Sequence, residues 1–371
     1  MEVILREEHE ELRRNVRRFL EEKSPMSEVR SLMETPEGYG GAVWSQMASQ
    51  LGLQGTCIPE RFGGSGFGYV ELGIVLEEMG RVLLCAPFFS TAVMAVATLT
   101  ASGDEAAQEE FLPGIASGST LATLAYAEGP DGWGVENVSS RAARKGGTWV
   151  LNGAKRFVLD GATAELILVV ANTDEGLSLF AVNRQAPGIA SAPLSTLDAT
   201  RKQADLDFRD TPGRLVGDEG AAARYLQRSL ALAAAALASE QVGGIERVLE
   251  MSVEYAKTRF QFGRPIGSFQ AVKHKCADML VAFETSKSAS SYAAWAVDAG
   301  SDELAVAASL AKAYCSEAYL RCAAENIQIH GGIGFTWEHD AHLYFKRAKS
   351  TELFLGHPSV HRQEIARLVG M

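Results

Sequence analysis

The period of the apolar residues changes twice along this 371-residue chain, and the order of these changes limits what it can fold into. Residues 1–118 carry apolar side chains at helical spacing, residues 119–222 form short β-rich runs between turn signals, and residues 223–371 return to long helical patterns. We therefore predict an N-terminal helical domain, a small middle barrel or sandwich, and a C-terminal helical domain. The Rossmann, P-loop, HExxH and GxSxG motifs do not occur in the sequence.

Three local patterns give more specific expectations. The segment 70–83 places its large apolar residues on one helical stripe, with acidic residues opposite. Residues 148–160 predict a β-hairpin that turns at Asn152-Gly153. Residues 231–263 predict one long helix, in which the pair Gly243-Gly244 allows close packing with a neighbour.

Composition limits the partners and the compartment. The formal net charge of −11 argues against nucleic-acid or anionic-membrane binding, because proteins of those classes normally carry a basic face. The five cysteines are scattered and form no CxxC pair, which is typical of reduced thiols in a cytosolic protein. The N-terminus is charged from residue 2 and lacks the apolar core of a signal peptide. We expect a cytoplasmic protein that binds neither nucleic acid nor membrane.

A first segment that could bind an anionic ligand covers residues 256–279. Arg259 could make charge-assisted bonds to a diphosphate, Phe262 could provide a packing surface, and Gln270 could provide an amide partner. A solvated helix end followed by a loop explains the same residues equally well. The segment alone therefore leaves both interpretations open.

A second such segment covers residues 325–340. Its adjacent glycines give a backbone that a ligand can approach closely, and Gln328 stands at the end of the preceding helix, although a helix C-cap is the commoner explanation. The nearby histidine cluster fits no standard zinc spacing, so we expect no metal there; it consists of His330, His339 and His342, with Asp340.

These two segments, in this order and at this separation, resemble the C-terminal domain of the acyl-CoA dehydrogenases. The resemblance covers essentially the whole chain. Residues 51–81 resemble the family's N-terminal helical segment, and residues 149–171 resemble its middle-domain NGxK…ITNG stretch. RFQFGRPIGSFQAVKHKCADM and QIHGGIGFT resemble its two C-terminal signatures. On these motifs the chain is identified as a member of the acyl-CoA dehydrogenase family.

Membership implies a middle β-barrel, a C-terminal bundle of the four-helix type, FAD at a dimer interface and a tetramer built as a dimer of dimers. It also implies α,β-dehydrogenation of an acyl-CoA thioester, in which a carboxylate removes the α-proton and electrons pass through flavin to electron-transfer flavoprotein. In this family a set of C-terminal residues clasps the ADP half of the FAD held by the neighbouring subunit. All of the set match here: Arg259, Phe262, Gln270, Gln328, Gly331 and Gly332.

The catalytic base is missing from both places where the family keeps it. Aligning Arg347-Ala348-Lys349 and Gly356 with the usual stretch puts Leu355 where the glutamate should be. The minority position on the long helix reads Ala233-Ala234. Glu240 lies about two turns further along that helix and could share the face of Ala233, although a packing role is the commoner meaning of such an acid.

The middle domain departs from the family pattern as well. Leu159 stands where the family has a threonine that faces the flavin. Ala127 lies in AYAEGPDGW (125–133), which has lost the threonine and the serine of the family's LTEPxAGSD. The losses fall on this chain's own flavin-ring and substrate site, whereas the retained residues serve the neighbour.

That asymmetry resembles the actinobacterial α2β2 acyl-CoA dehydrogenases that act on CoA thioesters of steroid side chains, in which one chain carries the base and the other completes the cofactor site. Three functions remain open. The first is a subunit without a catalytic residue of its own, working with a catalytic sister chain. The second is a self-sufficient homotetrameric dehydrogenase with Glu240 or another relocated acid as base. The third is a non-enzymatic binding or scaffold protein of the same fold.

Overall fold

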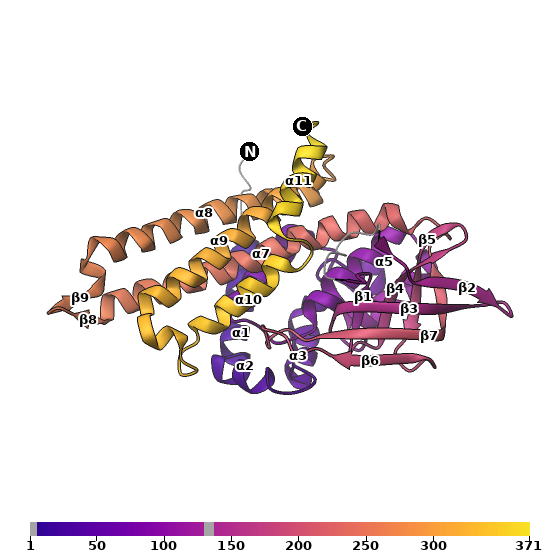
Figure 1. Cartoon of the computed structure of the whole chain (residues 1–371), viewed down its shortest axis with the longest axis horizontal. Helices are drawn as coiled ribbons and strands as arrows, with labels where there is room; N and C mark the ends of the chain where they lie inside the picture. Colours follow the sequence, from indigo (N-terminus) through magenta and orange to yellow (C-terminus); the bar gives the residue numbers. More distant parts are fainter. Residues whose placement is uncertain (1–5, 130–136) are drawn as a thin grey trace. The chain divides into compact units, whose positions relative to one another are not determined.

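The computed structural model describes residues 6–129 and 137–371, which belong to two compact units (Figure 1). One unit is helical and comprises residues 1–29, 69–84 and 234–371. The other comprises residues 30–68 and 85–233 and carries the large β-sheet. Segments of the N-terminal helical region occur in both units, and the predicted domain boundaries at residues 118 and 222 stay a prediction.

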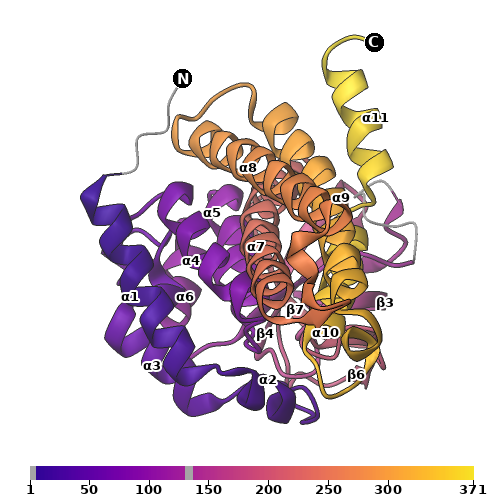
Figure 2. The same ribbon diagram turned by 90° about the vertical axis from the view of Figure 1, so that its left-hand side faces the viewer.

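The helical unit combines N-terminal and C-terminal elements. Its N-terminal helices are α1 (Glu7–Lys23), the first part of α2 (Met26–Leu32) and α4 (Tyr69–Arg81). The C-terminal elements are most of α7 (Ala222–Thr258), β8 (Phe260–Gln261), β9 (Arg264–Pro265), η5 (Ile266–Ser268), α8 (Gln270–Asp298), α9 (Leu304–His330), η6 (Gly331–Phe335), α10 (Ala341–Leu353) and α11 (Pro358–Leu368). Helices α8, α10 and α11 pack on α9, while α1 and α8 pack on α4 (Figure 2).

Helix α7 is continuous through its glycine pair, as predicted, but it ends at Thr258, and the last residues of the predicted helix, 259–263, instead lead into the β8–β9 hairpin. The glycine pair is a point of close packing. A Cβ atom at Gly243 would lie 1.8 Å from the carbonyl oxygen of Glu77 on α4. One at Gly244 would lie 2.3 Å from the ring of Tyr319 on α9. Since backbone and a buried ring cannot give way by that much, only glycine lets the three helices approach this closely.

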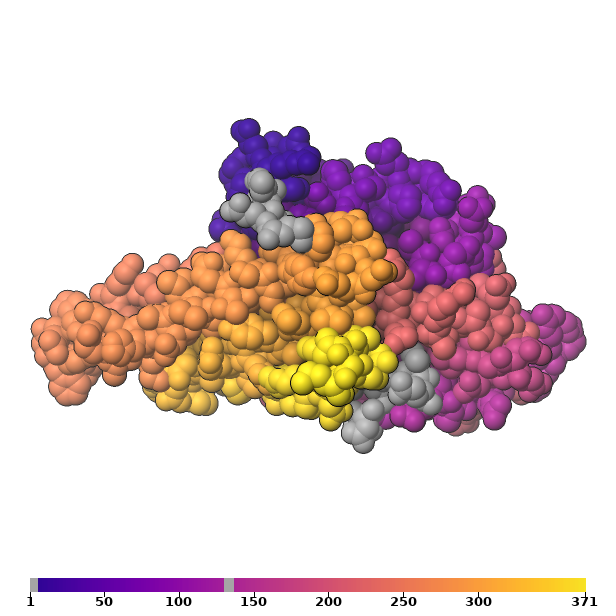
Figure 3. All heavy atoms as spheres, turned by 90° about the horizontal axis from the view of Figure 1, so that it is seen from above, coloured from indigo at the N-terminus to yellow at the C-terminus, as the bar shows by residue number. Residues whose placement is uncertain are grey.

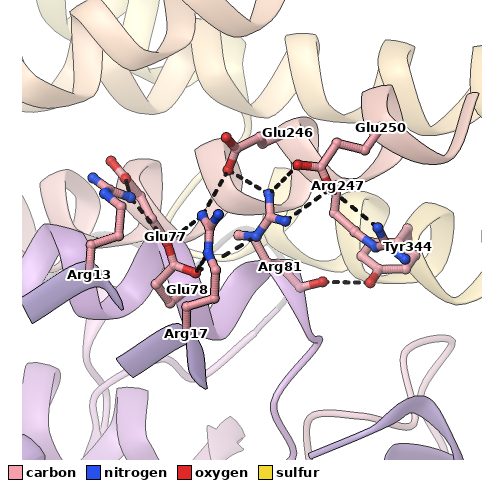
Figure 4. A network of polar contacts seen from close by, with 9 residues as sticks. All are labelled: Arg13, Arg17, Glu77, Glu78, Arg81, Glu246, Arg247, Glu250 and Tyr344. Carbon is pink, nitrogen blue, oxygen red and sulfur yellow. Dashed lines mark hydrogen bonds and ion pairs between the residues drawn. The ribbon is translucent and has the colours of Figure 1, made fainter. Parts of the chain in front are cut away.

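The sequence pattern did not predict that two acidic residues of α4, Glu77 and Glu78, are buried in an ion-pair network (Figure 4). Glu78 is only 1% exposed. It accepts hydrogen bonds from Arg17 Nε at 2.7 Å and Nη2 at 2.8 Å, and from Arg13 Nη1 at 3.1 Å. Arg13 Nη1 also lies 2.5 Å from Glu77. Buried charges persist only when they are paired, so these bonds fix α1 against α4.

Arg81 extends the same network to the C-terminal helices. Its Nη1 lies 2.6 Å from Glu246 and its Nη2 lies 2.9 Å from Glu250, both on α7, and its carbonyl oxygen accepts a 2.5 Å bond from the Tyr344 hydroxyl on α10. Burial by itself disfavours the Arg81 charge, yet the bonds to these carboxylates raise the pKa of Arg81 above its usual value. The guanidinium therefore stays charged and joins α4 to α7, while the backbone carbonyl of the same residue joins α4 to α10 (Figure 4).

The second unit combines short helices with the strands. Its helical elements are α3 (Gly41–Leu51), η1 (Leu53–Gly55), η2 (Glu60–Phe62), the π-type helix η3 (Phe89–Ala95), α5 (Val96–Ser102), α6 (Glu105–Ala116) and the start of α7. Its strands are β1 (Ala122–Ala125), β2 (Arg141–Lys145), β3 (Thr148–Leu159), β4 (Leu166–Thr173), β5 (Gly176–Asn183), β6 (Ile189–Pro193) and β7 (Gln203–Val216).

The strands close into a barrel, as the family resemblance implies. The ring runs β4-β2-β3-β7-β5, and β5 pairs back onto β4, while β1 adds to β4 and β6 adds to β7. Alternate residues of the strands point to the interior. They form an apolar core that includes Leu151, Val158, Ile167, Val169, Phe180, Val182, Leu206 and Phe208.

The predicted hairpin turn at Asn152-Gly153 is wrong. The chain turns at Gly146-Gly147, where both φ angles are positive, and β3 runs straight through Gly153 with a register shift against β7. Gly153 is required for a different reason, because a Cβ atom there would lie 2.3 Å from Ser140 Oγ. An Asn-Gly pair inside a strand therefore marks a bulge with close backbone approach rather than a turn.

Candidate cofactor-binding and catalytic site

The structure brings the six predicted cofactor residues to one end of the helical unit. Arg259 follows the last residue of α7, Gln270 is the first residue of α8, and Gln328 lies in the last turn of α9. Phe262 forms the turn of the β8–β9 hairpin, and the glycines Gly331 and Gly332 begin η6. Figure 1 shows this hairpin, the start of α8 and the end of α9 at the same end of the bundle.

Contacts between neighbouring helices fix this end. The ring of Tyr255 on α7 stacks on His330 of α9, with centroids 4.3 Å apart. Ser252 Oγ on α7 donates a 2.9 Å bond to Asn326 Oδ1 on α9. Lys275 of α8 pairs with Glu325 of α9. These contacts thus join the ends of three helices beneath the predicted cofactor residues.

The hairpin turn has the backbone geometry that favours a tight two-residue connection. Phe262 has φ 53° and Gly263 has φ 77°, so both central residues are left-handed, as in the type I′ turns that suit antiparallel strands. Arg259 is anchored on both sides, since its N–H donates to Tyr255 and its carbonyl accepts from Ile266 N. The Arg259 side chain therefore extends from a fixed backbone.

All six residues are exposed on this chain. Phe262 is 90% exposed, and no atom lies within 4 Å of a Cβ placed on Gly331 or Gly332, so their backbone is open to a ligand. The segment around residue 260, in orange, forms the surface of this end (Figure 3). This end of the helical unit offers a nucleotide diphosphate a cation, two amides, an open glycine backbone and an aromatic ring. It does not enclose such a ligand by itself.

Leu355, which the sequence motifs align with the family's base, lies just after α10 and is 7% exposed. Its φ of 60° is left-handed, which is uncommon for a residue other than glycine. Its carbonyl oxygen lies 2.9 Å from His361 Nε2 on α11. A leucine side chain can neither accept nor hold a proton, so this position offers no base.

Lys312 on α9 is fully buried beneath the same turn, and sequence reasoning missed it. Its Nζ donates to the carbonyl oxygens of Glu352 at 3.1 Å and Gly356 at 3.0 Å, and to Ser316 Oγ at 3.0 Å. Burial lowers the pKa of Lys312 to about 7. Burial, together with the charge of Lys312, lowers the pKa of His361 to about 4.

Glu240 is held in a buried ion pair. It is 4% exposed, and Arg347 Nη1, itself buried, donates to its Oε1 at 2.9 Å. Ala233 and Ala234 are buried and carry no titratable group. The acid that could stand in for the missing base therefore has a structural partner on α10.

In the barrel unit, Leu159 and Ala127 are buried and without hydroxyl groups. The Leu159 carbonyl accepts a 2.6 Å bond from Thr123 Oγ1, and the Ala127 carbonyl accepts from Arg156 N at 2.8 Å. Residues 130–133 of the altered AYAEGPDGW stretch lie outside the described residues.

Sequence reasoning also missed the anchor of that stretch. Lys155, fully buried on β3, lies 2.6 Å from the Glu128 carboxylate, which also accepts from the backbone N–H groups of Ser139 and Ser140. Burial alone would raise the pKa of Glu128, but these bonds lower it to about 2. The pair therefore holds residue 128 against the barrel.

Two further searches cover the described residues only. Within 6–129 and 137–371, no group of three or more His, Cys, Asp or Glu side chains is arranged to hold a metal ion. None of the helices in these ranges is both long enough and apolar enough to cross a membrane.

Comparisons with known proteins cover nearly the whole chain. Family models for the N-terminal, middle and C-terminal domains of acyl-CoA dehydrogenase match residues 6–119, 123–211 and 222–370. Among curated proteins, the chain is 35% identical to the acyl-CoA dehydrogenase IpdE2 of Mycobacterium tuberculosis (strain ATCC 25618 / H37Rv), over 98% of this chain and 96% of the relative.

Solved structures agree in fold. A variant of the Tcur3481-Tcur3483 steroid ACAD matches with a TM-score of 0.89 and 31% identity, over 98% of both chains. A chain of the ChsE4-ChsE5 complex from Mycobacterium tuberculosis matches with a TM-score of 0.90 and 29% identity, over 100% of this chain and 99% of that one. The helical, barrel and helical regions and these matches confirm the resemblance: the chain belongs to the acyl-CoA dehydrogenase family of FAD-dependent oxidoreductases.

Proposed function

We propose that this chain is a non-catalytic subunit of an acyl-CoA dehydrogenase and completes the FAD site of a catalytic sister chain in an α2β2 tetramer. One contrast carries the proposal. The residues that serve a neighbour's cofactor are all present and exposed, whereas the position of this chain's own base holds Leu355. An enzyme subunit that has lost its base but kept a surface for another subunit's cofactor acts through that subunit.

The residues present fit the ADP half of FAD. Arg259 supplies charge for the diphosphate, Gln270 and Gln328 supply amides, and the open backbone at Gly331 allows close approach. Bound FAD would supply the hydride acceptor, whose ring the sister chain would hold. In this chain Leu159 replaces the family's flavin-facing threonine. This replacement also favours binding of the flavin ring by the sister chain and of the ADP half by this chain.

Two structural relatives support the assembly and the substrate class. One is a chain of the ChsE4-ChsE5 complex, and the other is a variant of the Tcur3481-Tcur3483 steroid ACAD. We therefore propose an acyl-CoA thioester with a steroid-derived side chain as substrate of the complex, electron-transfer flavoprotein as electron acceptor, and the cytoplasm as location.

The self-sufficient homotetramer is less favoured, because its base would be Glu240. That carboxylate is buried and bonded to Arg347, and taking a proton would weaken a buried ion pair. We assign Glu240 a packing role. The scaffold alternative differs from both enzymes in needing no flavin.

The stoichiometry of FAD tests the proposal. Co-expressed with its sister chain, the protein should purify as an α2β2 tetramer with about one FAD per heterodimer, because only the sister chain keeps the ring-binding half of the site. Native mass spectrometry and the flavin absorbance per protein measure this. A stable homotetramer with one flavin per chain would contradict the proposal, and a complex without flavin would favour the scaffold.

The substitution Arg259→Ala tests which chain binds the diphosphate. It should strip FAD from the complex although the sister chain is unchanged, since each charge-assisted bond contributes roughly 1.5–3 kcal/mol and the FAD dissociation constant should rise about 10-fold or more. The matched control is Arg264→Ala, whose guanidinium lies on the same hairpin over the Phe269 ring. Unchanged flavin occupancy and turnover in Arg259→Ala would rule out the shared site.

A further inference from the structure

The turn that carries Leu355 is held by side chains from two other helices. Lys312 of α9 donates to the carbonyl oxygens of Glu352 and Gly356, which flank the turn. His361 of α11 lies 2.9 Å from the carbonyl oxygen of Leu355 itself. Three carbonyl groups within five residues are therefore bonded to two side chains, and none of these bonds involves the side chain at position 355.

The backbone needs such support. Leu355 has φ 60° and Gly356 has φ 101°, and a left-handed leucine places its Cβ close to the following carbonyl oxygen. Leucine by itself disfavours the left-handed backbone conformation. Since residues in disfavoured backbone regions persist only where the surroundings impose them, the bonds from Lys312 and His361 are the source of the constraint.

The charges around the turn decide how these bonds respond to pH. The groups that face Lys312 are the Glu352 carboxylate on α10, Cys315 and Ser316 on α9, and His361 on α11. Glu352 also pairs with Lys349 and lies 4.0 Å from His357. At neutral pH His361 is uncharged and donates from Nε2, while Lys312 keeps at least two N–H donors in either protonation state.

We propose that Lys312 and His361 are positioning residues that hold the backbone of residues 352–356 in one conformation, whichever side chain stands at 355. The chain thus keeps the backbone of the family's base position although no carboxylate stands there. The meaning of that position rests on the proposed function. The shape of the turn does not, because it depends only on contacts within the helical unit. A glutamate substituted at residue 355 would thus adopt the backbone conformation that Leu355 has now.

Hydrogen–deuterium exchange tests the support directly. The N–H groups of Phe354 and Gly356 are bonded to Ser350 and Leu353. In Lys312→Met the peptide that covers them should exchange about 10-fold faster than in wild type, with peptides of the barrel unit unchanged. The control Lys349→Met removes a lysine that pairs with the Glu352 carboxylate and should leave exchange within about twofold. Equal exchange in wild type and Lys312→Met would overturn the proposal.

A pH profile tests whether Lys312 is buried beneath the turn in the folded protein. The pKa of Lys312 is lowered from an ordinary 10.5 to about 7 in the folded protein, so the unfolded chain binds the extra proton between these values and stability rises with pH. The melting temperature of wild type minus that of Lys312→Met should therefore grow from pH 7 to pH 10. A difference that is flat with pH would contradict the role of the buried amine.

Two more variants keep the proposal falsifiable if Lys312→Met folds poorly. His361→Gln keeps an N–H donor and should retain slow exchange at residues 354–356, whereas His361→Leu should lose it. Leu355→Glu should retain it as well, and Leu355→Glu with Lys312→Met should not. Rapid exchange in Leu355→Glu alone would show that the leucine itself holds the turn. Catalysis enters none of these readouts, so they can fail independently of the proposed function.

Discussion

Purified without a sister chain and supplied with FAD, the protein is expected to show no bleaching of flavin absorbance on addition of acyl-CoA. In the proposed function, Leu355 and Ala233 take the two positions where the family keeps its base, and neither side chain can accept the α-proton. Loss of a general base typically lowers a rate by about 10²–10⁴-fold. Anaerobic stopped-flow absorbance in the flavin band measures the reduction.

Dithionite supplies the control for that experiment, because it should bleach any bound flavin regardless of the base. Rapid reduction by a saturated acyl-CoA would refute the non-catalytic role. If Glu240→Gln then abolished the activity, the relocated base would be identified. Leu355→Glu alone is not expected to restore turnover, since Leu159 and Ala127 also differ from the family pattern.

Replacing Glu78 by glutamine should destabilise the helical unit by about 3–5 kcal/mol, the cost of removing one partner from a buried ion pair. The glutamine keeps the volume but leaves Arg13 and Arg17 without the carboxylate that they share, at a site where Glu78 is 1% exposed. Denaturant unfolding followed by far-UV circular dichroism measures the loss.

The matched control lies on the same helix. Glu71 pairs with His9 but is partly exposed, so Glu71→Gln should cost about 1 kcal/mol or less. If Glu78→Gln and Glu71→Gln were equally mild, the network would not hold α1 against α4, and the packing of α4 would depend on its apolar stripe alone.

Periodicity was sufficient to predict the architecture but not the polar interior. The β-rich runs predicted a small barrel or sandwich, which the family resemblance narrowed to a barrel, and the alanine-rich segment predicted most of α7. The Asn152-Gly153 pair led to a wrong prediction of the hairpin turn, because Asn-Gly occurs both in turns and at bulges within a strand. The burial of Glu78 was invisible, since its partners Arg13 and Arg17 lie more than sixty positions away along the chain.

The candidate site, like the fold, was only partly predictable from the sequence. Motif resemblance selected Arg259, Gln328 and their neighbours, and the structure brings these to one end of the helical unit. Lys312 went unnoticed although a lone lysine on the apolar face of an alanine-rich helix is a usable signal. Its two carbonyl partners are on residues 40 and 44 positions downstream, and no local pattern encodes bonds to a backbone.

The exposed aromatic residues near the hairpin have a consequence for how the cell must make this protein. Besides Phe262, exposed aromatic side chains of this region include Phe260, Phe335 and Trp337. If the chain acts through a sister chain, as proposed, a newly made copy that has not yet met that chain exposes these rings to chaperones, proteases and other copies of itself. Balanced synthesis of the two chains, such as shared translation from one message, would shorten that wait and limit the losses of orphan subunits.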